Sequence, residues 1–226
     1  MDKTLIVGAS KGIGQELLKQ LSDKYCVSFS RNDIDIQPTN HEHYSLDVTK
    51  DELPELEELN SIIYCPGSIN LKPIGSLKID DFTNDFEINV LGAIKVIKKY
   101  FRQLSKKENA SILLFSTVAV EQGMPFHSSI AVAKGGIEGL TKSLAAEFAG
   151  KIRVNCIAPS ITNTPLAAGI LRNDDAVDRV SQRHPSKKIN NPEDVASMAA
   201  FLTNNSAKNI TGQIIHIDGG MSTLKL

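Results

Sequence analysis

The sequence has little of several features that define whole classes of protein. It contains no tryptophan and only three cysteines, which are too widely separated to match a zinc spacing or a paired disulfide framework. The 25 lysines and arginines nearly balance the 26 aspartates and glutamates, so no charge excess attracts nucleic acid or an anionic membrane. No apolar run approaches the ~18 residues that span a bilayer. We therefore expect no nucleic-acid partner, no membrane span and no disulfide scaffold.

Two further absences concern location and metals. Met1-Asp2-Lys3 leads directly into an apolar run, without the charged-then-apolar layout of a secretory signal. Together with the unpaired cysteines, this predicts a reducing, cytoplasmic compartment. No histidine, cysteine and carboxylate residues recur at a metal-ligand spacing, so no metal site is expected. The acidic residues considered for such a site are Asp47, Asp80, Asp81 and Asp85.

What is present indicates one packed α/β domain over residues 1–226. Hydrophobic residues make up 41% of the chain, and short apolar runs alternate with longer helical patterns. Runs that are apolar throughout are typical of strands covered on both faces, so we expect a doubly wound parallel sheet of the Rossmann-like type, with about seven strands. The expected strands are Thr4–Val7, Cys26–Ser30, His43–Leu46, Ser61–Cys65, Ser111–Ser116, Arg153–Ala158 and Gln213–Ile217. The expected helices are Gly12–Ser22, Asp80–Leu104, Ser128–Gly150, Thr164–Arg183 and Pro192–Thr203.

Two segments interrupt this alternation. The segment from Asn32 to Glu42 is too short and polar for a full helix, so the second crossover is expected to be a loop. Residues 166–191 follow the sixth strand and look irregular and polar. Because loops beyond the carboxyl ends of the strands form the ligand crevice of such a sheet, residues 166–191 are a candidate substrate lid.

A glycine-rich turn joins the first expected strand to the first expected helix, in Val7-Gly8-Ala9-Ser10-Lys11-Gly12-Ile13-Gly14. Glycines there permit a tight turn and let backbone N–H groups approach a pyrophosphate at the positive end of a helix. The spacing Gly-x3-Gly-x-Gly differs from the Gly-x-Gly-x-x-Gly of the general dinucleotide fingerprint. A purely structural turn is the alternative, but the position between strand and helix favours a nucleotide site.

Two cations indicate which nucleotide is bound. Lys11 lies inside the glycine turn, and Arg31 follows the second strand, where an NAD-selective site typically has an acid for the ribose hydroxyls. An ammonium and a guanidinium would instead flank a 2′-phosphate. The alternative is that both are solvated surface charges. Their joint occurrence favours NADP(H) as the cofactor.

Along essentially its whole length the chain resembles the short-chain dehydrogenase/reductase family. The resemblance implies hydride transfer between a nicotinamide cofactor and a small-molecule carbonyl substrate. Its motifs are Gly8-x3-Gly12-x-Gly14, Leu46–Thr49, Ile88–Gly92, Arg153–Pro159, Thr162–Leu166, Ile210–Gln213 and Asp218–Gly220. The cofactor-binding residues that follow from it are Gly8, Ser10, Lys11, Gly12, Ile13, Gly14, Arg31, Asp47, Val48, Gly67, Lys134, Pro159, Ile161 and Thr164.

The family's catalytic set is Ser–Tyr–Lys–Asn, and here its tyrosine position holds Ile130. Asn89, which would hold a water of a proton relay, and Lys134, which would bind the nicotinamide ribose, both match. The serine position falls on Thr117, and the adjacent Ser116 takes the role if the register differs by one. The usual proton donor is therefore missing. Loss of a positioned acid typically costs roughly 10²- to 10⁴-fold in rate.

Two more departures lie at the cofactor cleft. Tyr64-Cys65-Pro66-Gly67 replaces the family's Asn-Asn-Ala-Gly after the fourth strand and keeps only the glycine. Ser160 replaces the glycine that normally follows Pro159. Both would alter the geometry or the affinity of the cofactor site.

His127 is the first candidate to replace the tyrosine. It lies seven residues before Lys134 and projects on nearly the same side of a helix as Lys134 and Ile130. The enoyl-acyl-carrier-protein reductases of the wider family place their tyrosine at this position, and an imidazole delivers a proton near neutral pH. The alternative is that His127 is a solvated residue that only caps or precedes the helix.

Two other rescues are open. The hydroxyls of Ser128 and Ser129 can donate hydrogen bonds, but they are poor acids and are better explained as N-caps of the helix that begins there. A substrate such as an iminium or a conjugated system needs little acid help, and the hydroxyl at the serine position would then suffice. The sequence does not favour either over the other.

Functions of other classes remain as alternatives. A sensor or scaffold would bind NADP(H) without turnover and could still retain Asn89 and Lys134. A hydrolase triad built on Ser116 and His127 lacks the Gly-x-Ser-x-Gly elbow. The family commonly assembles through its two long central helices, here about 80–104 and 128–150, so the resemblance implies a homodimer or homotetramer.

Overall fold

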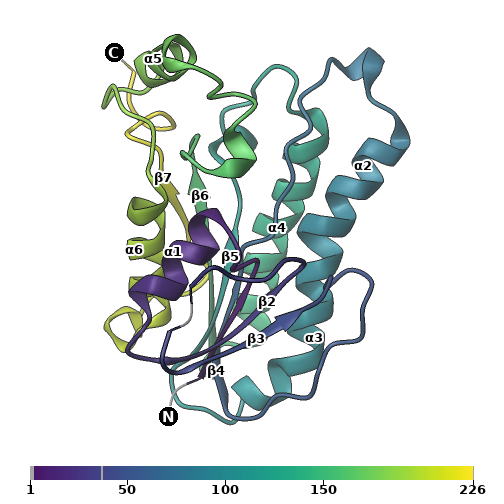
Figure 1. Cartoon of the computed structure of the whole chain (residues 1–226), viewed down its shortest axis with the longest axis vertical. Helices are drawn as coiled ribbons and strands as arrows, with labels where there is room; N and C mark the ends of the chain where they lie inside the picture. The colour runs from purple at the N-terminus through teal and green to yellow at the C-terminus, as the bar shows by residue number, and fades with distance from the viewer. Residues whose placement is uncertain (1–2, 37, 226) are drawn as a thin grey trace.

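A seven-stranded parallel sheet forms the middle layer of the molecule (Figure 1). The structure is a computed structural model and describes residues 3–36 and 38–225. The strand order β3-β2-β1-β4-β5-β6-β7 confirms the doubly wound, Rossmann-like α/β fold. The strands are β1 (Lys3–Val7), β2 (Tyr25–Ser30), β3 (His41–Ser45), β4 (Leu59–Tyr64), β5 (Ala110–Phe115), β6 (Ile152–Pro159) and β7 (Ile214–Ile217).

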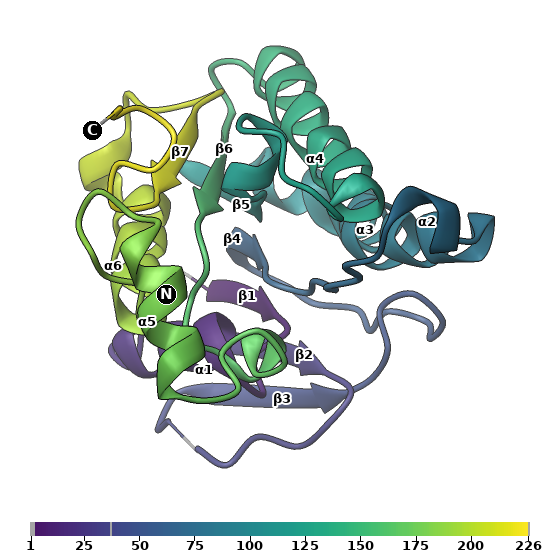
Figure 2. The same cartoon turned by 90° about the horizontal axis from the view of Figure 1, so that it is seen from above.

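Helices cover both faces of this sheet and form one apolar core on each side (Figure 2). Helices α1 (Gly12–Gln20) and α6 (Pro192–Thr203) pack on one face. Helices α3 (Gly92–Leu104) and α4 (Ser128–Glu147) pack on the other, together with α2 (Ile79–Phe86) at its side. Successive strand residues point to opposite faces, so Leu5 enters the α3/α4 core and Ile6 enters the α1/α6 core. None of the described helices is long and apolar enough to cross a membrane.

The two irregular segments differ in outcome. Between β2 and β3 the described residues contain no helix, as expected. The helix expected over Thr164–Arg183 is wrong, because the chain there forms a single 3₁₀ turn (Pro165–Ala167) and then a separate helix α5 (Asp174–Gln182). Asn173 starts that helix as its N-cap, with its side-chain oxygen accepting from the Ala176 N–H at 2.9 Å.

The helix expected over Asp80–Leu104 is also interrupted. A π-helical segment, Glu87–Leu91, joins α2 to α3, and the Gly92 N–H donates to the Glu87 carbonyl five residues earlier. Such wide turns are frequent at functional sites because they redirect side chains without ending the helix. Here the π segment carries Asn89, whose side chain is 1% exposed.

Tyr64 ties this π segment to the sheet. Its hydroxyl, at the end of β4, donates to the Ile88 carbonyl at 2.7 Å. A Cβ atom on Gly92 would lie only 2.2 Å from the tyrosine oxygen, so the hydroxyl reaches the helix only because residue 92 is glycine. Tyr64, one of the departures from the family pattern, therefore fixes the turn that presents Asn89.

Tyr64→Phe removes this part-buried hydrogen bond between β4 and the π segment. We expect the free energy of unfolding to fall by about 0.5–1.5 kcal/mol, and the side-chain amide of Asn89 to lose protection from hydrogen exchange in NMR. Tyr100→Phe is the matched control, because the Tyr100 hydroxyl is also buried and donates to the Pro54 carbonyl at 2.7 Å. Equal loss of protection at Asn89 in both variants would contradict the assignment.

Candidate functional site

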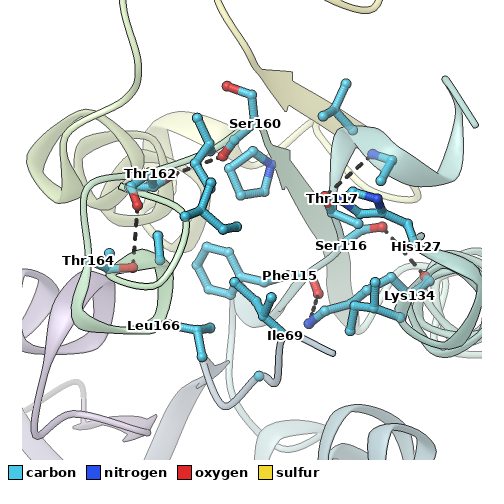
Figure 3. Close-up of a pocket in the computed structure, with 18 of the residues that line it drawn as sticks. Ile69, Phe115, Ser116, Thr117, His127, Lys134, Ser160, Thr162, Thr164 and Leu166 are labelled. Carbon is cyan, nitrogen blue, oxygen red and sulfur yellow. Dashed lines mark hydrogen bonds between the residues drawn. The ribbon is translucent and has the colours of Figure 1, made fainter. Parts of the chain in front are cut away.

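A cavity of about 250 Å³ opens at the carboxyl ends of the central strands (Figure 3). Its walls come from the segments that follow β4, β5 and β6, from the start of α4, and from residues 166–191. The strand order reverses between β1 and β4, and this switch point is where open α/β sheets bind their ligands. The lining residues that the sequence analysis named are Ile13, Gly67, Ser116, Thr117, His127, Ile130, Lys134, Pro159, Ser160, Ile161 and Thr164.

The remaining cofactor candidates do not line this cavity. The glycine turn lies between β1 and α1, Arg31 follows β2, and Asp47 and Val48 follow β3. These positions form a second cluster at the same edge of the sheet, at the ends of its first three strands. Their assignment to a cofactor stays a prediction. The cluster contains Gly8, Ser10, Lys11, Gly12, Gly14, Arg31, Asp47 and Val48.

The glycine turn is packed so tightly that larger residues would not fit. Gly8 has a φ of +84° and Gly12 a φ of +59°, a region that residues with a Cβ rarely adopt. A Cβ on Gly14 would lie 2.3 Å from the Gly8 carbonyl oxygen. The start of α1 thus lies directly against the end of β1, as a pyrophosphate-binding turn requires.

The charges around this turn fit a phosphorylated ribose. Lys11 and Arg31 are both exposed, and neither forms an ion pair with another described residue. Partial burial opposes ionisation of Asp47, but hydrogen bonds from Thr49 and the nearby Lys50 and Arg31 outweigh it and lower the carboxyl pKa. Asp47 therefore stays ionised, with one oxygen held by the Thr49 N–H and hydroxyl.

The side chains of Lys134 and Asn89 both reach the small space beside the Cα atom of Gly67, which is called here the hollow over Gly67. The Lys134 ammonium donates to the Phe115 carbonyl at 2.8 Å, and burial lowers its pKa to about 8, against the raising effect of Cys156, Cys65 and Asp85. A Cβ on Gly67 would lie 3.7 Å from Lys134 Nζ and 3.6 Å from Asn89 Oδ1. Within the described part of the chain, Asn89 Oδ1 is buried without a hydrogen-bond partner. This orphaned acceptor and the adjacent ammonium fit the hydroxyl groups of a bound ribose or water.

Thr117 and Ser116 differ in what their hydroxyls do. Ser116 Oγ donates to Glu138 Oε1 at 2.6 Å, in α4. Thr117 Oγ1 accepts from the Ala119 N–H at 3.4 Å and donates to no described residue. Of these two residues, only Thr117 therefore has a hydroxyl hydrogen that is free for a substrate oxygen. This favours Thr117 over Ser116 as the residue at the family's serine position.

The start of α4 places His127 and Ile130 on the cavity wall. Ile130 is 5% exposed and offers no polar atom. His127 is the N-cap residue of α4, and its Nδ1 lies 2.7 Å from the Pro125 carbonyl. That acceptor assigns a hydrogen to Nδ1 and leaves Nε2 for another partner. Figure 3 labels His127 and Thr117 among the residues that line the cavity.

Ser128 and Ser129 do not cap this helix, so that interpretation is wrong. The N-cap position belongs to His127, and no side chain caps the helix. Ser128 is exposed, whereas Ser129 is buried and its hydroxyl donates to Asp85 Oδ2 at 2.5 Å. The serines lie one position too late because the turn at Phe126, with a φ of +70°, ends just before His127.

The rest of the cavity wall was found from the sequence only in part, through the candidate lid 166–191 and the motif residues Cys65 and Thr162. The other residues come from loops far apart along the chain and follow no period, so no local pattern signals them. Six of the lining residues belong to the candidate lid over 166–191, whose role as a lid stays a prediction. The additional lining residues are Cys65, Ser68, Ile69, Leu71, Phe115, Val118, Ala119, Met124, Thr162, Leu166, Ala167, Ile170, Val180, Arg183, His184 and Met221.

Ser160 ties the lid segment to the sheet. His184 Nδ1 lies 3.0 Å from the Val180 carbonyl, which assigns its hydrogen to Nδ1 and makes Nε2 the acceptor for Ser160 Oγ at 2.9 Å. Asn190 Nδ2 also donates to Ser160 Oγ, at 3.2 Å. In the sequence, only the replacement of the family's glycine by Ser160 pointed to this contact. Among the described residues, no group of three or more histidine, cysteine or acidic side chains is placed to hold a metal.

Comparison with known proteins is consistent with this geometry. Residues 8–222 match the family model described as enoyl-(acyl carrier protein) reductase. The 3-oxoacyl-[acyl-carrier-protein] reductase FabG of Rickettsia prowazekii is 30% identical, over 96% of this chain and 95% of its own. FabG of Staphylococcus epidermidis is 26% identical, over 96% and 97% of the two chains.

A solved structure extends this likeness to three dimensions. ElxO with NADP bound superposes with a TM-score of 0.89 at 27% identity, over 99% of both chains. The motifs, the strand order and these full-length matches agree with one another. The chain belongs to the short-chain dehydrogenase/reductase family of oxidoreductases.

Proposed function

We propose that this protein is an NADP(H)-dependent oxidoreductase with a divergent active site, which transfers hydride to or from a small carbonyl, enoyl or imine substrate. The observation that carries the proposal is the pairing of the Lys134 ammonium with the unpartnered Asn89 Oδ1 over Gly67, at the switch point of the sheet. The bound nicotinamide supplies the hydride. The protein supplies binding, orientation and the proton.

NADP(H) is proposed over NAD(H) because Lys11 lies within the glycine turn and Arg31, instead of an acid, is the first residue after β2. A 2′-phosphate between Lys11 and Arg31 would form charge-assisted hydrogen bonds with both. Both side chains are exposed and unpaired among the described residues, so no existing ion pair has to break. The NADP-bound state of ElxO, at 27% identity, is in keeping with this choice.

The chain's own residues divide the remaining work. The free Thr117 hydroxyl orients the substrate oxygen and stabilises negative charge there, while Lys134 binds ribose hydroxyls and Asn89 holds a water. His127 lines the same wall and, as an imidazolium with a hydrogen on Nε2 as well as on Nδ1, acts as the proton donor in place of the absent tyrosine. Residues 166–191 act as the lid, since six of them line the cavity.

The second candidate is an NADP(H)-binding sensor or scaffold without turnover. Ile130 favours it, because the side chain at the tyrosine position is apolar and 5% exposed. Both candidates share the cofactor residues and differ only in proton transfer.

A homodimer or homotetramer in the cytoplasm is part of the proposal. Exposed apolar side chains lie on α2, on the π segment that continues it, and on α4. These elements belong to the two long central helices through which the family assembles. Ile79 is 79% exposed and Val132 is 59% exposed. Phe86 and Leu91 extend the same surface.

Nucleotide preference tests the cofactor assignment. We expect calorimetry to show NADPH binding at least about 10-fold more tightly than NADH, because hydrogen bonds between charged groups contribute about 1.5–3 kcal/mol each. Arg31→Ala should weaken NADPH binding by about that factor and leave NADH binding unchanged. Arg102→Ala, at an exposed site on α3, is the control. Equal loss for both nucleotides in Arg31→Ala would rule out a 2′-phosphate contact.

Restoring the tyrosine separates the enzyme from the binding module. Ile130→Tyr should raise NADPH oxidation on a panel of carbonyl, enoyl and imine compounds by about 10²- to 10⁴-fold. If the wild type is an enzyme that uses His127, His127→Phe should reduce its turnover by a similar factor without changing the NADPH dissociation constant. NADPH binding with no wild-type turnover, alongside an active Ile130→Tyr variant, supports the sensor or scaffold.

A further inference from the structure

Asp85 is the one buried side chain of α2. It is 3% exposed, in a helix whose other residues are half-buried or exposed. Among the described residues no cation lies within ion-pair distance of it. A buried carboxylate without such a partner is destabilising unless hydrogen bonds satisfy its oxygens.

Two serine hydroxyls, from different parts of the chain, meet this requirement. Ser68 Oγ, in the loop after β4, donates to Asp85 Oδ1 at 2.5 Å. Ser129 Oγ, near the start of α4, donates to Asp85 Oδ2 at 2.5 Å and also lies 3.2 Å from the Asp81 carbonyl. Each carboxylate oxygen therefore accepts one hydroxyl hydrogen.

Ser68 is the member of this cluster that reaches the cavity. It lines the cavity wall, whereas Asp85, Asn89 and Ser129 do not. Its oxygen accepts from Asn89 Nδ2 at 2.9 Å while its hydrogen goes to Asp85. A hydroxyl donates one hydrogen bond and accepts two, so Ser68 Oγ retains one acceptor position for a donor in the cavity.

The cluster also lies next to the groups already assigned to the site. Asn89 connects it to the hollow over Gly67, and the negative charge of Asp85 raises the pKa of Lys134 against the effect of burial. Ser129 immediately precedes Ile130 on α4. A titratable carboxyl therefore accepts a hydrogen bond from the residue that immediately precedes the family's tyrosine position.

We propose that Asp85 and Ser68 form a proton relay for this cavity, and that this relay, in place of His127, exchanges the substrate proton. The relay rests on the proposed oxidoreductase function. In the direction of alcohol oxidation, the substrate hydroxyl gives its proton to Ser68 Oγ as Ser68 gives its own to Asp85 Oδ1. Ser68 ends as a neutral hydroxyl and Asp85 as a neutral acid, so one proton moves and none is lost. Reduction runs the same transfers in reverse. Ser129 donates to Oδ2 throughout, so Asp85 stays in place.

The relay makes a specific claim about mutants. Asp85→Asn keeps the shape of the side chain but cannot accept the proton from Ser68, and Ser68→Ala breaks the link to the cavity. With NADP⁺ and ethyl 3-hydroxybutyrate as the probe, each variant should oxidise alcohol about 10²-fold more slowly, and the double variant no more slowly than either. Asp81→Asn, which makes the same charge change on the same helix, should keep the wild-type rate.

A second measurement does not depend on turnover. The ¹³C carboxyl resonance of Asp85, assigned by its absence in Asp85→Asn, reports on the hydrogen bonds to its oxygens. In Ser68→Ala this resonance should shift, because Oδ1 loses the hydroxyl that donates to it. In Ser105→Ala, whose hydroxyl donates to the Arg102 carbonyl, it should stay in place.

The outcomes distinguish the relay from the function on which it rests. If calorimetry shows no NADP⁺ or NADPH binding, the proposed function fails and the relay with it. If NADP⁺ binds but Ser68→Ala leaves the Asp85 carboxyl resonance unchanged, or Asp85→Asn oxidises alcohol at the wild-type rate, the relay alone is overturned. It is also overturned if the wild type binds NADP⁺ without oxidising the probe while Ile130→Tyr does oxidise it, because the tyrosine is then the required group.

Discussion

The pairing of β1 with β2 on one side and β4 on the other is the constraint on which the site depends. Because all seven strands are parallel, their carboxyl ends share one edge, and the crossovers diverge where the order reverses. The glycine turn leaves β1 at that point, directly beside the loop after β4. Lys134 and Thr117 then line one cavity, and Asn89 lies beside Lys134 at Gly67, although the three residues are far apart along the chain.

The site retains the family's residues at the positions expected to bind the nucleotide, but it lacks the family's usual proton donor. Gly8, Gly12 and Gly14 keep the tight turn, and Lys134 and Asn89 keep their places around Gly67. The apolar Ile130 side chain removes the donor that hydride chemistry normally needs. Polar groups gather around this gap instead, with His127 on the cavity wall and hydroxyls bound to a buried carboxylate behind it.

Sequence reasoning succeeded where one local pattern had one structural explanation. Buried parallel strands are apolar throughout, so their runs were recognisable, and the helix expected over Pro192–Thr203 has those bounds in the structure. It failed where a single residue changes the backbone path. The π segment barely changes the spacing of apolar residues over 80–104, so the sequence predicted one uninterrupted helix there. Asn173 caps a separate helix within a stretch that the sequence also predicted as one helix. The hydrogen bond of Ser129 was not predicted, because its acceptor, Asp85, is 44 residues away along the chain.

The sequence alone determined the fold class, the glycine turn, the two cations that favour NADP(H) and the loss of the tyrosine, since each is a matter of residue type at a fixed spacing. Only the tertiary structure decided how the departures are accommodated. It placed Tyr64 against the Ile88 carbonyl, Ser160 against His184, and Ser68 against Asp85. These contacts join residues that no period or motif relates, because distance in the folded chain, and not in the sequence, decides which polar groups satisfy one another.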